Sequence, residues 1–163
     1  MTLIDAPAYD PRPDRIKRNA LIGGLVFIAL AIVIGMGGYV DGHGWFFSNI
    51  PSEHKVDHFL SALEAKDYQA AYNIYTNNHP DPAYPISRFT EDWTTYSPVK
   101  GPITSHRLEI SRTDGTGVFG SGVIVGVHLN NRPTCTFLYV IRADGTMTIA
   151  LHDIVYHACN NDA

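Results

Sequence analysis

The sequence predicts an α+β domain that is tethered to a membrane by one N-terminal helix. Three observations support this class of fold. Residues 20–40 form an uncharged apolar run, residues 52–96 carry apolar side chains at helical spacing, and residues 103–156 form runs rich in β-favouring residues. Because the helical stretches precede the strands, we expect helices packed on one face of a curved four-stranded antiparallel sheet.

The composition excludes some classes of protein. Of the 163 residues, 45% are hydrophobic and 17% charged, which is typical of a globular domain. The formal net charge is −4. Binding to nucleic acid depends on clustered Lys and Arg, so we expect no nucleic acid as a partner.

The uncharged run at residues 20–40 predicts a transmembrane helix. At about 1.5 Å per residue it spans roughly 30 Å, the thickness of the hydrocarbon core of a bilayer. A cleaved signal peptide is the alternative, but its apolar run is about 7–15 residues long and ends in a small-residue cleavage site. Here the run is longer and no A-x-A motif follows it. We therefore expect an uncleaved anchor in the lipid bilayer.

The charges that flank this helix predict its orientation. The bases that precede it are Arg12, Arg15, Lys17 and Arg18, whereas the next base after it is Lys55. The positive-inside rule then places residues 1–19 in the cytoplasm, where residues 1–14 read as a flexible tail. Residues 41–50 form an aromatic connector at the surface of the inner membrane, and residues 51–163 form a periplasmic or extracellular domain.

Three helices are expected at the start of this domain. Ser52 is the candidate N-cap of the first helix, and Glu53 suits its first turn. The apolar stripes of the three helices are Val56, Phe59, Leu60 and Leu63, then Tyr68, Ala71, Tyr72 and Tyr75, then Ile86, Phe89, Trp93 and Tyr96. Three prolines within residues 77–85 place a loop before the third helix.

Four strands are expected to follow as an antiparallel meander, at residues 103–112, 118–129, 134–142 and 147–156, with DGTG, NNRP and ADGT as turns. Asp144-Gly145 indicates a two-residue type I′ loop, which pairs Leu138 with Leu151. Glycines in the second strand indicate curvature. Both faces of the sheet read as apolar. The helices cover one of them, and we expect a protein partner, most simply a second copy of the chain, on the other.

Residues 56–76, VDHFLSALEAKDYQAAYNIYT, resemble the opening helices of the nuclear transport factor 2-like superfamily, in particular its uncharacterised membrane-anchored bacterial branch. The motif is AKDY at residues 65–68 followed by Ala71-Tyr72, and the resemblance extends over residues 56–156. It implies a cone of helices against a bent sheet that encloses a pocket, often with dimerisation across the sheet. The superfamily contains enzymes such as ketosteroid isomerase and many members without known chemistry, so the fold does not choose a function.

No motif for catalysis, a cofactor or a metal ion stands out. His54 and His58 share a helical face as metal-binding pairs do, but no third ligand stands at a fixed offset, which favours solvated surface histidines. The helical stripes supply the candidate pocket residues Phe59, Leu63, Tyr72, Trp93 and Tyr96. The alternative is that these side chains simply fill the core.

We therefore expect a binding or assembly domain without catalytic activity, cofactor or metal. Two alternatives stay open. One is a pocket enzyme of the lyase or isomerase type, which needs a carboxylate or histidine beside a polarising tyrosine. The other is an accessory subunit of a larger membrane complex.

Cys135 and Cys159 are the only two cysteines, and both follow the membrane helix. Disulfides persist outside the cytoplasm, and an even number of cysteines there favours a bridge. In the expected register Cys135 opposes Ile154, so the chain must turn back after Tyr156 to bring the two sulfurs together. We expect a Cys135–Cys159 disulfide.

Overall fold

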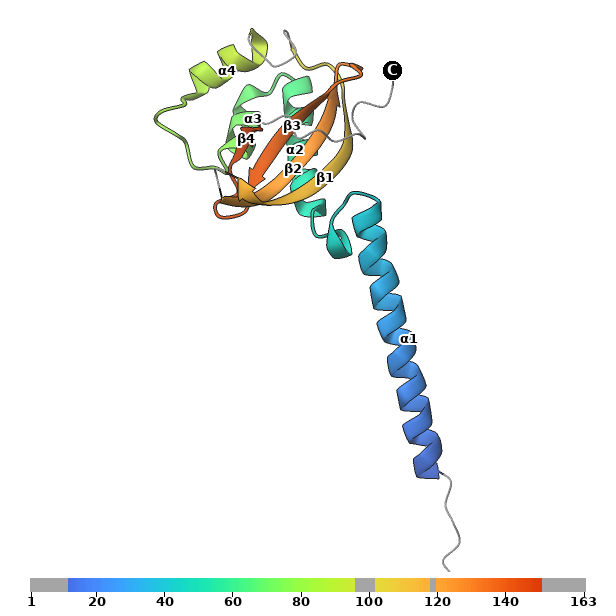
Figure 1. The fold of residues 1–163 in the computed structure, drawn as a ribbon. Helices are drawn as coiled ribbons and strands as arrows, with labels where there is room; N and C mark the ends of the chain where they lie inside the picture. Colours follow the sequence, from blue (N-terminus) through green and yellow to red (C-terminus); the bar gives the residue numbers. More distant parts are fainter. Residues whose placement is uncertain (1–11, 96–101, 118–119, 151–163) are drawn as a thin grey trace, which may run out of the picture.

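The computed structural model describes residues 12–95, 102–117 and 120–150, which form a long N-terminal helix and an α+β unit (Figure 1). The helices are α1 (Arg12–Val40), the 3-10 turn η2 (Trp45–Phe47), α2 (Ile50–Glu64), α3 (Tyr68–Tyr75) and α4 (Ile86–Thr94). The strands are β1 (His106–Gly117), β2 (Gly120–Leu129), β3 (Cys135–Ile141) and β4 (Met147–Ile149). They form one antiparallel sheet of order β1-β2-β3-β4, which confirms the predicted α+β class and meander.

Helix α1 is longer than the apolar run that predicted it. It begins at Arg12, so residues 12–14, which we expected in the flexible tail, are helical. A proline at position 13 is compatible with this start, because its missing N–H has no partner in the first turn of any helix. Helix α1 extends away from the sheet, and only 6% of its most apolar 18 residues are buried (Figure 1). Within the described residues it is the one helix long and apolar enough to cross a membrane.

Helix α2 begins before its predicted cap. Asn49 occupies the N-cap position and Pro51 lies in the first turn, so the assignment of Ser52 as the cap is wrong. The Ser52 N–H instead donates to the Asn49 carbonyl over 2.9 Å. Proline suits the first turn of a helix, so α2 begins nearer to α1 than expected.

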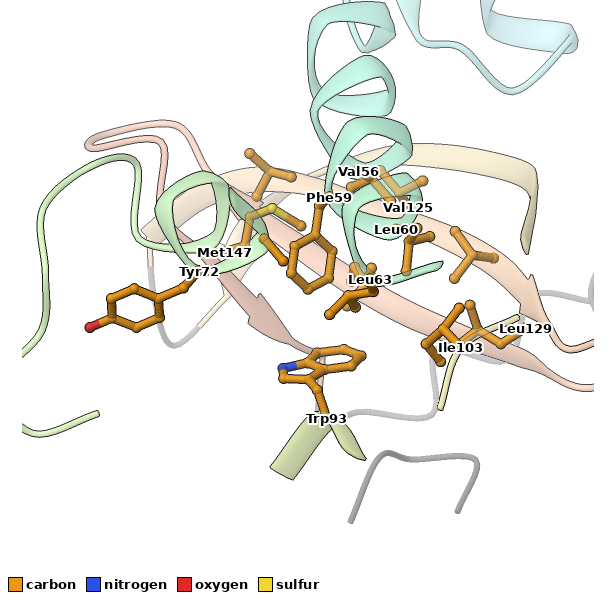
Figure 2. Close-up of a cluster of buried hydrophobic side chains, with 14 of the residues drawn as sticks. Val56, Phe59, Leu60, Leu63, Tyr72, Trp93, Ile103, Val125, Leu129 and Met147 are labelled. Carbon is orange, nitrogen blue, oxygen red and sulfur yellow. The ribbon is translucent and has the colours of Figure 1, made fainter. Parts of the chain in front are cut away.

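The hydrophobic core lies between the helices and one face of the sheet (Figure 2). Helix α2 contributes four fully or almost fully buried side chains, Val56, Phe59, Leu60 and Leu63. They pack with side chains from α3, α4 and the three strands β2, β3 and β4, among them Ala71, Tyr72, Phe89, Trp93, Val123, Val125, Val127, Leu138 and Met147. Burying one such side chain stabilises a fold by about 1.5–3 kcal/mol, so this shared core holds the helices on the sheet.

The β3–β4 hairpin differs from the predicted one. Leu138 pairs with Ile149, not with Leu151, so the predicted register is wrong by two residues. The Gly145 N–H donates to the Ile141 carbonyl over 2.9 Å, which closes a four-residue loop in place of the expected two-residue loop.

Local hydrogen bonds explain this longer loop. The Asp144 carboxylate accepts bonds from the N–H and the hydroxyl of Thr146, each 2.8 Å long, and Gly145 takes a left-handed conformation with φ +73°. A shift of two residues leaves every side chain on its predicted face, because side chains in a strand alternate with a period of two. The side chains that share each face of the sheet are therefore the ones that the predicted register groups together.

Strand β1 runs beyond its predicted end at Arg112. It continues to Gly117, which pairs with Gly120, so the turn expected at residues 114–117 is wrong. Two irregularities in the pairing, after Leu108 and after Asp114, absorb the extra residues. Bulges of this kind increase the twist of a strand, which fits the curvature expected for the sheet.

The face of the sheet opposite the helices is partly buried within the chain. Ile124, His128 and Tyr139 are 3%, 7% and 3% exposed. The Tyr139 ring lies over Gly122, because a Cβ at Gly122 would meet Tyr139 Cζ at 2.5 Å. These side chains are buried without a second copy of the chain, and the dimer expected on this face stays a prediction.

Candidate functional site

The strongest candidate site lies where α1 meets the globular unit, at residues 41–49, which we call the junction. The junction folds back on the end of α1. The His43 N–H donates to the Gly38 carbonyl over 2.8 Å, and the Asn49 N–H donates to the His43 carbonyl over 3.0 Å. Gly42 permits this path, since its φ of +81° is a conformation that residues with a Cβ rarely adopt.

The junction is hydrogen-bonded to the edge strand β1. The Ser111 N–H donates to the Gly42 carbonyl over 2.8 Å. The contact is close, since a Cβ at Gly42 would lie 2.7 Å from Ile110 Cγ1. An edge strand with unpaired backbone groups is prone to pair with other chains, so the junction protects part of this edge.

A polar cluster joins the junction to α2. His43 Nδ1 lies 2.9 Å from both carboxylate oxygens of Glu53. The Ser111 hydroxyl lies 2.5 Å from Glu53 Oε1 and 2.9 Å from the Gly42 carbonyl, and its single proton can satisfy one of these acceptors at a time. The Glu53 side chain is 12% exposed, so α2, β1 and the junction share one shielded carboxylate.

Asn49 lies within this cluster and is fully buried. Its Oδ1 accepts a hydrogen bond of 3.0 Å from the Thr113 hydroxyl. Its Nδ2 has no hydrogen-bond partner among the described residues. A buried donor left without a partner costs about 1–3 kcal/mol, so this amide is a place where an acceptor atom would gain binding energy.

A pocket of about 260 Å³ opens beside Asn49. Tyr39 at the end of α1 and Trp45 in η2 form its aromatic wall, while Ile110 and Arg112 of β1 line its other side. Tyr39 and Trp45 are 55% and 54% exposed, and their ring centroids lie 6.0 Å apart. The pocket thus combines an apolar wall with a buried amide donor and one basic residue among its lining.

The five residues expected to line a pocket do not lie at the junction. Phe59, Leu63, Tyr72 and Trp93 belong to the core (Figure 2), and Tyr96 lies outside the described residues. The rings of Phe59 and Trp93 meet edge to face with centroids 5.1 Å apart. The Tyr72 hydroxyl donates to the Tyr84 carbonyl over 3.0 Å. None of the four lines the pockets reported for the described residues, and the choice between a lined pocket and a filled core stays a prediction.

A second pocket, of about 430 Å³, lies between α3 and the β3–β4 hairpin and is lined in part by Tyr75 and Tyr84. Burial raises the pKa of both hydroxyls above the ordinary value. The Tyr84 hydroxyl also bonds to the Asp92 carboxylate, which raises its pKa further. A hydroxyl that keeps its proton near neutral pH cannot act as a general base there, although it can donate a hydrogen bond.

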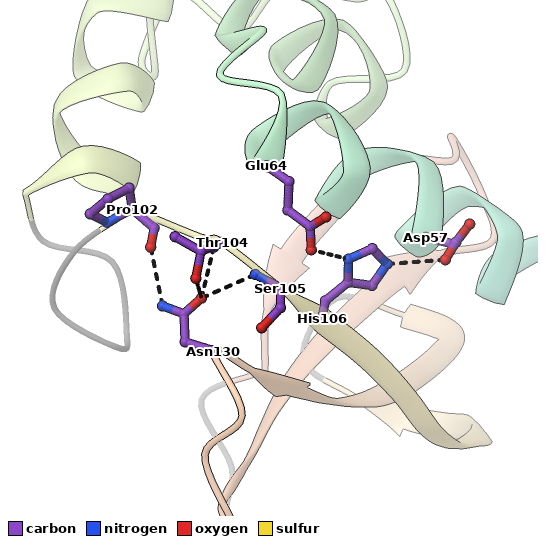
Figure 3. Close-up of polar contacts among 7 residues, drawn as sticks. All are labelled: Asp57, Glu64, Pro102, Thr104, Ser105, His106 and Asn130. Atoms are coloured by element: carbon purple, nitrogen blue, oxygen red, sulfur yellow. Dashed lines mark hydrogen bonds and ion pairs between the residues drawn. The ribbon is translucent and has the colours of Figure 1, made fainter.

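His106 is held between two carboxylates of α2 (Figure 3). Its Nδ1 lies 2.6 Å from Glu64 Oε1, and its Nε2 lies 3.0 Å from Asp57 Oδ1. The His106 side chain is only 9% exposed. With both ring nitrogens engaged, neither is available to a substrate, and the cluster acts as a polar link between α2 and β1.

The histidines considered as metal ligands lie elsewhere on α2. His54 and His58 are both exposed, as expected for solvated surface residues. The part of the chain that the structure describes contains no group of three or more His, Cys, Asp or Glu side chains placed to hold a metal ion.

Cys135 begins β3 and is disulfide-bonded. Its Sγ lies 3.5 Å from His128 Nε2 on the face of the sheet opposite the helices. Cys159 lies outside the described residues, so the Cys135–Cys159 pairing stays a prediction.

Comparison with known proteins identifies no relative of this chain: no family model, no curated protein and no solved structure matches it significantly. The resemblance to the nuclear transport factor 2-like superfamily therefore stays an expectation carried by the short motif at residues 65–68 and 71–72.

The sequence predicts residues 41–50 as a connector at the membrane surface, but it gives no sign that Asn49 and Ser111 belong to a site. Their contact partners are far away in the sequence, and neither residue belongs to a motif. The available signal was the pair Gly42 and Gly44, because glycines at fixed places in a connector indicate positive φ or a close approach.

Proposed function

We propose that the chain is a single-pass membrane protein whose globular domain binds or assembles with partners outside the cytoplasm, without catalysing a reaction. One observation carries the membrane anchor: the C-terminal end of the exposed apolar helix α1 is packed against the folded junction. A Cβ at Gly38 would lie 2.6 Å from the Gly44 carbonyl oxygen, and a Cβ at Gly35 would lie 2.9 Å from the Phe46 ring. Removal of α1 as a signal peptide would discard these contacts.

The low burial of α1 supports the same proposal. A helix of this length in a soluble protein is covered by the rest of the fold, whereas only 6% of the most apolar 18 residues of α1 are buried. Large apolar side chains such as Phe27 and Val33 are 72% and 66% exposed. Exposure of so much apolar surface is unfavourable in water and favourable in lipid.

The assignment to binding or assembly follows from the roles of the ionisable groups. His106 and Glu53 both connect elements of the fold, and Tyr84 holds its proton. Trp45 and Phe46, at 54% and 58% exposed, offer apolar contacts at the membrane surface to lipid or to neighbouring subunits. The exposed rings of Trp45 and Phe46 also favour a role as an accessory subunit of a membrane complex.

A cone-shaped fold of the nuclear transport factor 2-like type is part of this proposal. Its support is the placement of α2, α3 and α4 on one face of the sheet, together with the bulged strand β1 and the motif at residues 65–68. The proposed orientation, with the N-terminus in the cytoplasm of a bacterial cell and the domain in the periplasm, rests on the bases before α1.

Topology and processing can be tested on the full-length chain. We expect a C-terminal alkaline phosphatase fusion to be active in a bacterial host, and the untagged protein to remain in the membrane pellet after alkaline carbonate extraction with its full mass of 18.0 kDa. A shortened product released from the membrane would contradict the anchor. An inactive fusion in an intact, membrane-bound protein would contradict only the orientation. Co-purification from solubilised membranes then tests for protein partners.

A further inference from the structure

We infer that the pocket at the junction binds the headgroup region of an anionic phospholipid from the leaflet at the C-terminal end of α1. This inference rests on the proposed membrane anchor and extends it, because it assigns a ligand to a site that the anchor alone does not require. It also explains two features of the junction, the orphan Asn49 amide and the exposed aromatic wall.

The position of the pocket favours a lipid as its ligand. The pocket is lined by Tyr39 and Val40, the last two residues of the apolar helix. If the apolar run fills the hydrocarbon core, these residues lie at the level of the glycerol and ester groups of the leaflet. Trp45, exposed beside Tyr39, belongs at the same level, since Trp and Tyr concentrate at membrane interfaces. A ligand that enters from the bilayer therefore reaches the pocket directly.

The polar side of the pocket selects an anionic headgroup. Arg112 lines the pocket from β1, is exposed and already interacts within the chain. Its guanidinium group carries five N–H donors, so it can add a phosphate oxygen to its present partner through charge-assisted hydrogen bonds. The pocket side chain Asn49 has a buried Nδ2 without an acceptor among the described residues. An ester carbonyl or phosphate oxygen supplies that acceptor. The remaining wall, from Val40 and Ile110, is aliphatic and suits the first methylene groups of an acyl chain.

Selective quenching of Trp45 fluorescence tests the lipid assignment on the full-length protein in lipid nanodiscs. In one sample, phosphatidylglycerol brominated on its acyl chains is a minor component of unbrominated phosphatidylcholine. In the reference sample, the bromine is carried by the phosphatidylcholine and the phosphatidylglycerol is unbrominated. Trp93, which is 2% exposed in the core, gives a constant background. One favourably placed basic group favours an anionic lipid by about fivefold, so we expect preferential quenching by brominated phosphatidylglycerol of about that size.

Variants of two arginines show which residue causes the preference for phosphatidylglycerol. We expect Arg112→Gln to abolish it and Arg112→Lys to retain most of it, because the positive charge persists. Arg132→Gln is the matched control, since Arg132 is exposed in the β2–β3 loop, at the end of the sheet remote from α1 (Figure 1), and the preference should survive. Equal quenching by the two lipids in the unaltered protein, or a preference that persists in Arg112→Gln, would overturn the inference.

Two further arms separate the possible explanations. Soluble glycerol 3-phosphate in excess should leave the preference unchanged. If it abolishes the preference, the pocket binds a free phosphate compound and the lipid assignment is wrong. Carbonate extraction of the same variants reports on the anchor itself. A protein that stays in the membrane without lipid preference contradicts the lipid site alone, whereas one that is extracted contradicts the proposed function.

Discussion

The backbone N–H of Ser111 in β1 donates a 2.8 Å hydrogen bond to the carbonyl of Gly42, two residues beyond the end of α1. This bond joins the apolar helix to the edge of the sheet without an intervening flexible linker. The geometry depends on glycine, since Gly42 has φ +81° and lies against Ile110. Helix α1 and the globular unit are thus connected through a defined contact.

The first prediction concerns Gly42. Gly42→Ala places a Cβ 2.7 Å from Ile110 Cγ1 and in a left-handed backbone conformation, which alone costs about 1–2 kcal/mol. We expect the free energy of unfolding of the detergent-solubilised protein to fall by at least this amount in denaturant titrations. Gly37→Ala is the control, because a Cβ at Gly37 meets nothing within 4 Å. Equal effects of the two substitutions would mean that the junction is not specifically packed.

The second prediction concerns the polar link between α2 and β1. His106→Gln cannot satisfy both Glu64 and Asp57, so the unfolding free energy should fall by about 1–3 kcal/mol. His58 is an exposed residue of α2, so His58→Gln should change the unfolding free energy by less than about 0.5 kcal/mol. Chemical denaturation monitored by circular dichroism measures both. An unchanged unfolding free energy in His106→Gln would show that the link contributes nothing to stability.

The third prediction concerns the contact between Gly122 and Tyr139. A Cβ at Gly122 would lie 2.5 Å from both Tyr139 Cζ and the Val140 carbonyl oxygen, and the backbone oxygen cannot rotate away. Gly122→Ala should therefore destabilise the domain by about 1–3 kcal/mol. Ser121→Ala, at the exposed neighbouring position, is the control. Thermal melts measure the effect, and equal melting temperatures of Gly122→Ala and Ser121→Ala would contradict the close packing.

The fourth prediction is a loss of stability at alkaline pH. The pKa of Tyr84 is raised in the folded chain by burial and by its bond to Asp92. Above about pH 10 the unfolded chain releases this proton while the folded chain keeps it, so stability is lost as the pH rises further. Tyr75, whose pKa burial also raises, acts in the same direction. Between about pH 9 and about pH 11 we expect the melting temperature of Tyr84→Phe to fall less than that of the unaltered protein.

Parallel melting curves for Tyr84→Phe and the unaltered protein across this range would contradict the assignment to Tyr84. Absorbance titration of the tyrosines provides an independent measurement. In it, Tyr84→Phe should remove one of the hydroxyl groups that ionise only at the high-pH end.

The fifth prediction is the disulfide. Mass spectrometry of the unreduced protein should yield a peptide that links Cys135 to Cys159. Reduction should lower the melting temperature, because a bridge stabilises small domains by about 2–4 kcal/mol. Free alkylation of both thiols without prior reduction would refute the bridge.

The sequence by itself was sufficient for the features that depend on composition and periodicity. The apolar run at residues 20–40 lies within α1, and the helical stripes appear as α2, α3 and α4. The alternation of side chains groups Val123, Val125 and Val127 on one face of the second strand, and all three are buried. These features are local, because the composition and the apolar period of one segment are enough to predict them.

Only the tertiary structure decided the features that depend on contacts between distant residues. Asp144-Gly145 fits both a two-residue and a four-residue loop, and the bonds to Thr146 and Ile141 select the longer one. Ser111 meets Gly42 across 69 positions, and His106 meets Glu64 across 42. No periodicity connects such pairs, since their proximity arises when α2 docks on the sheet and the junction folds back against β1.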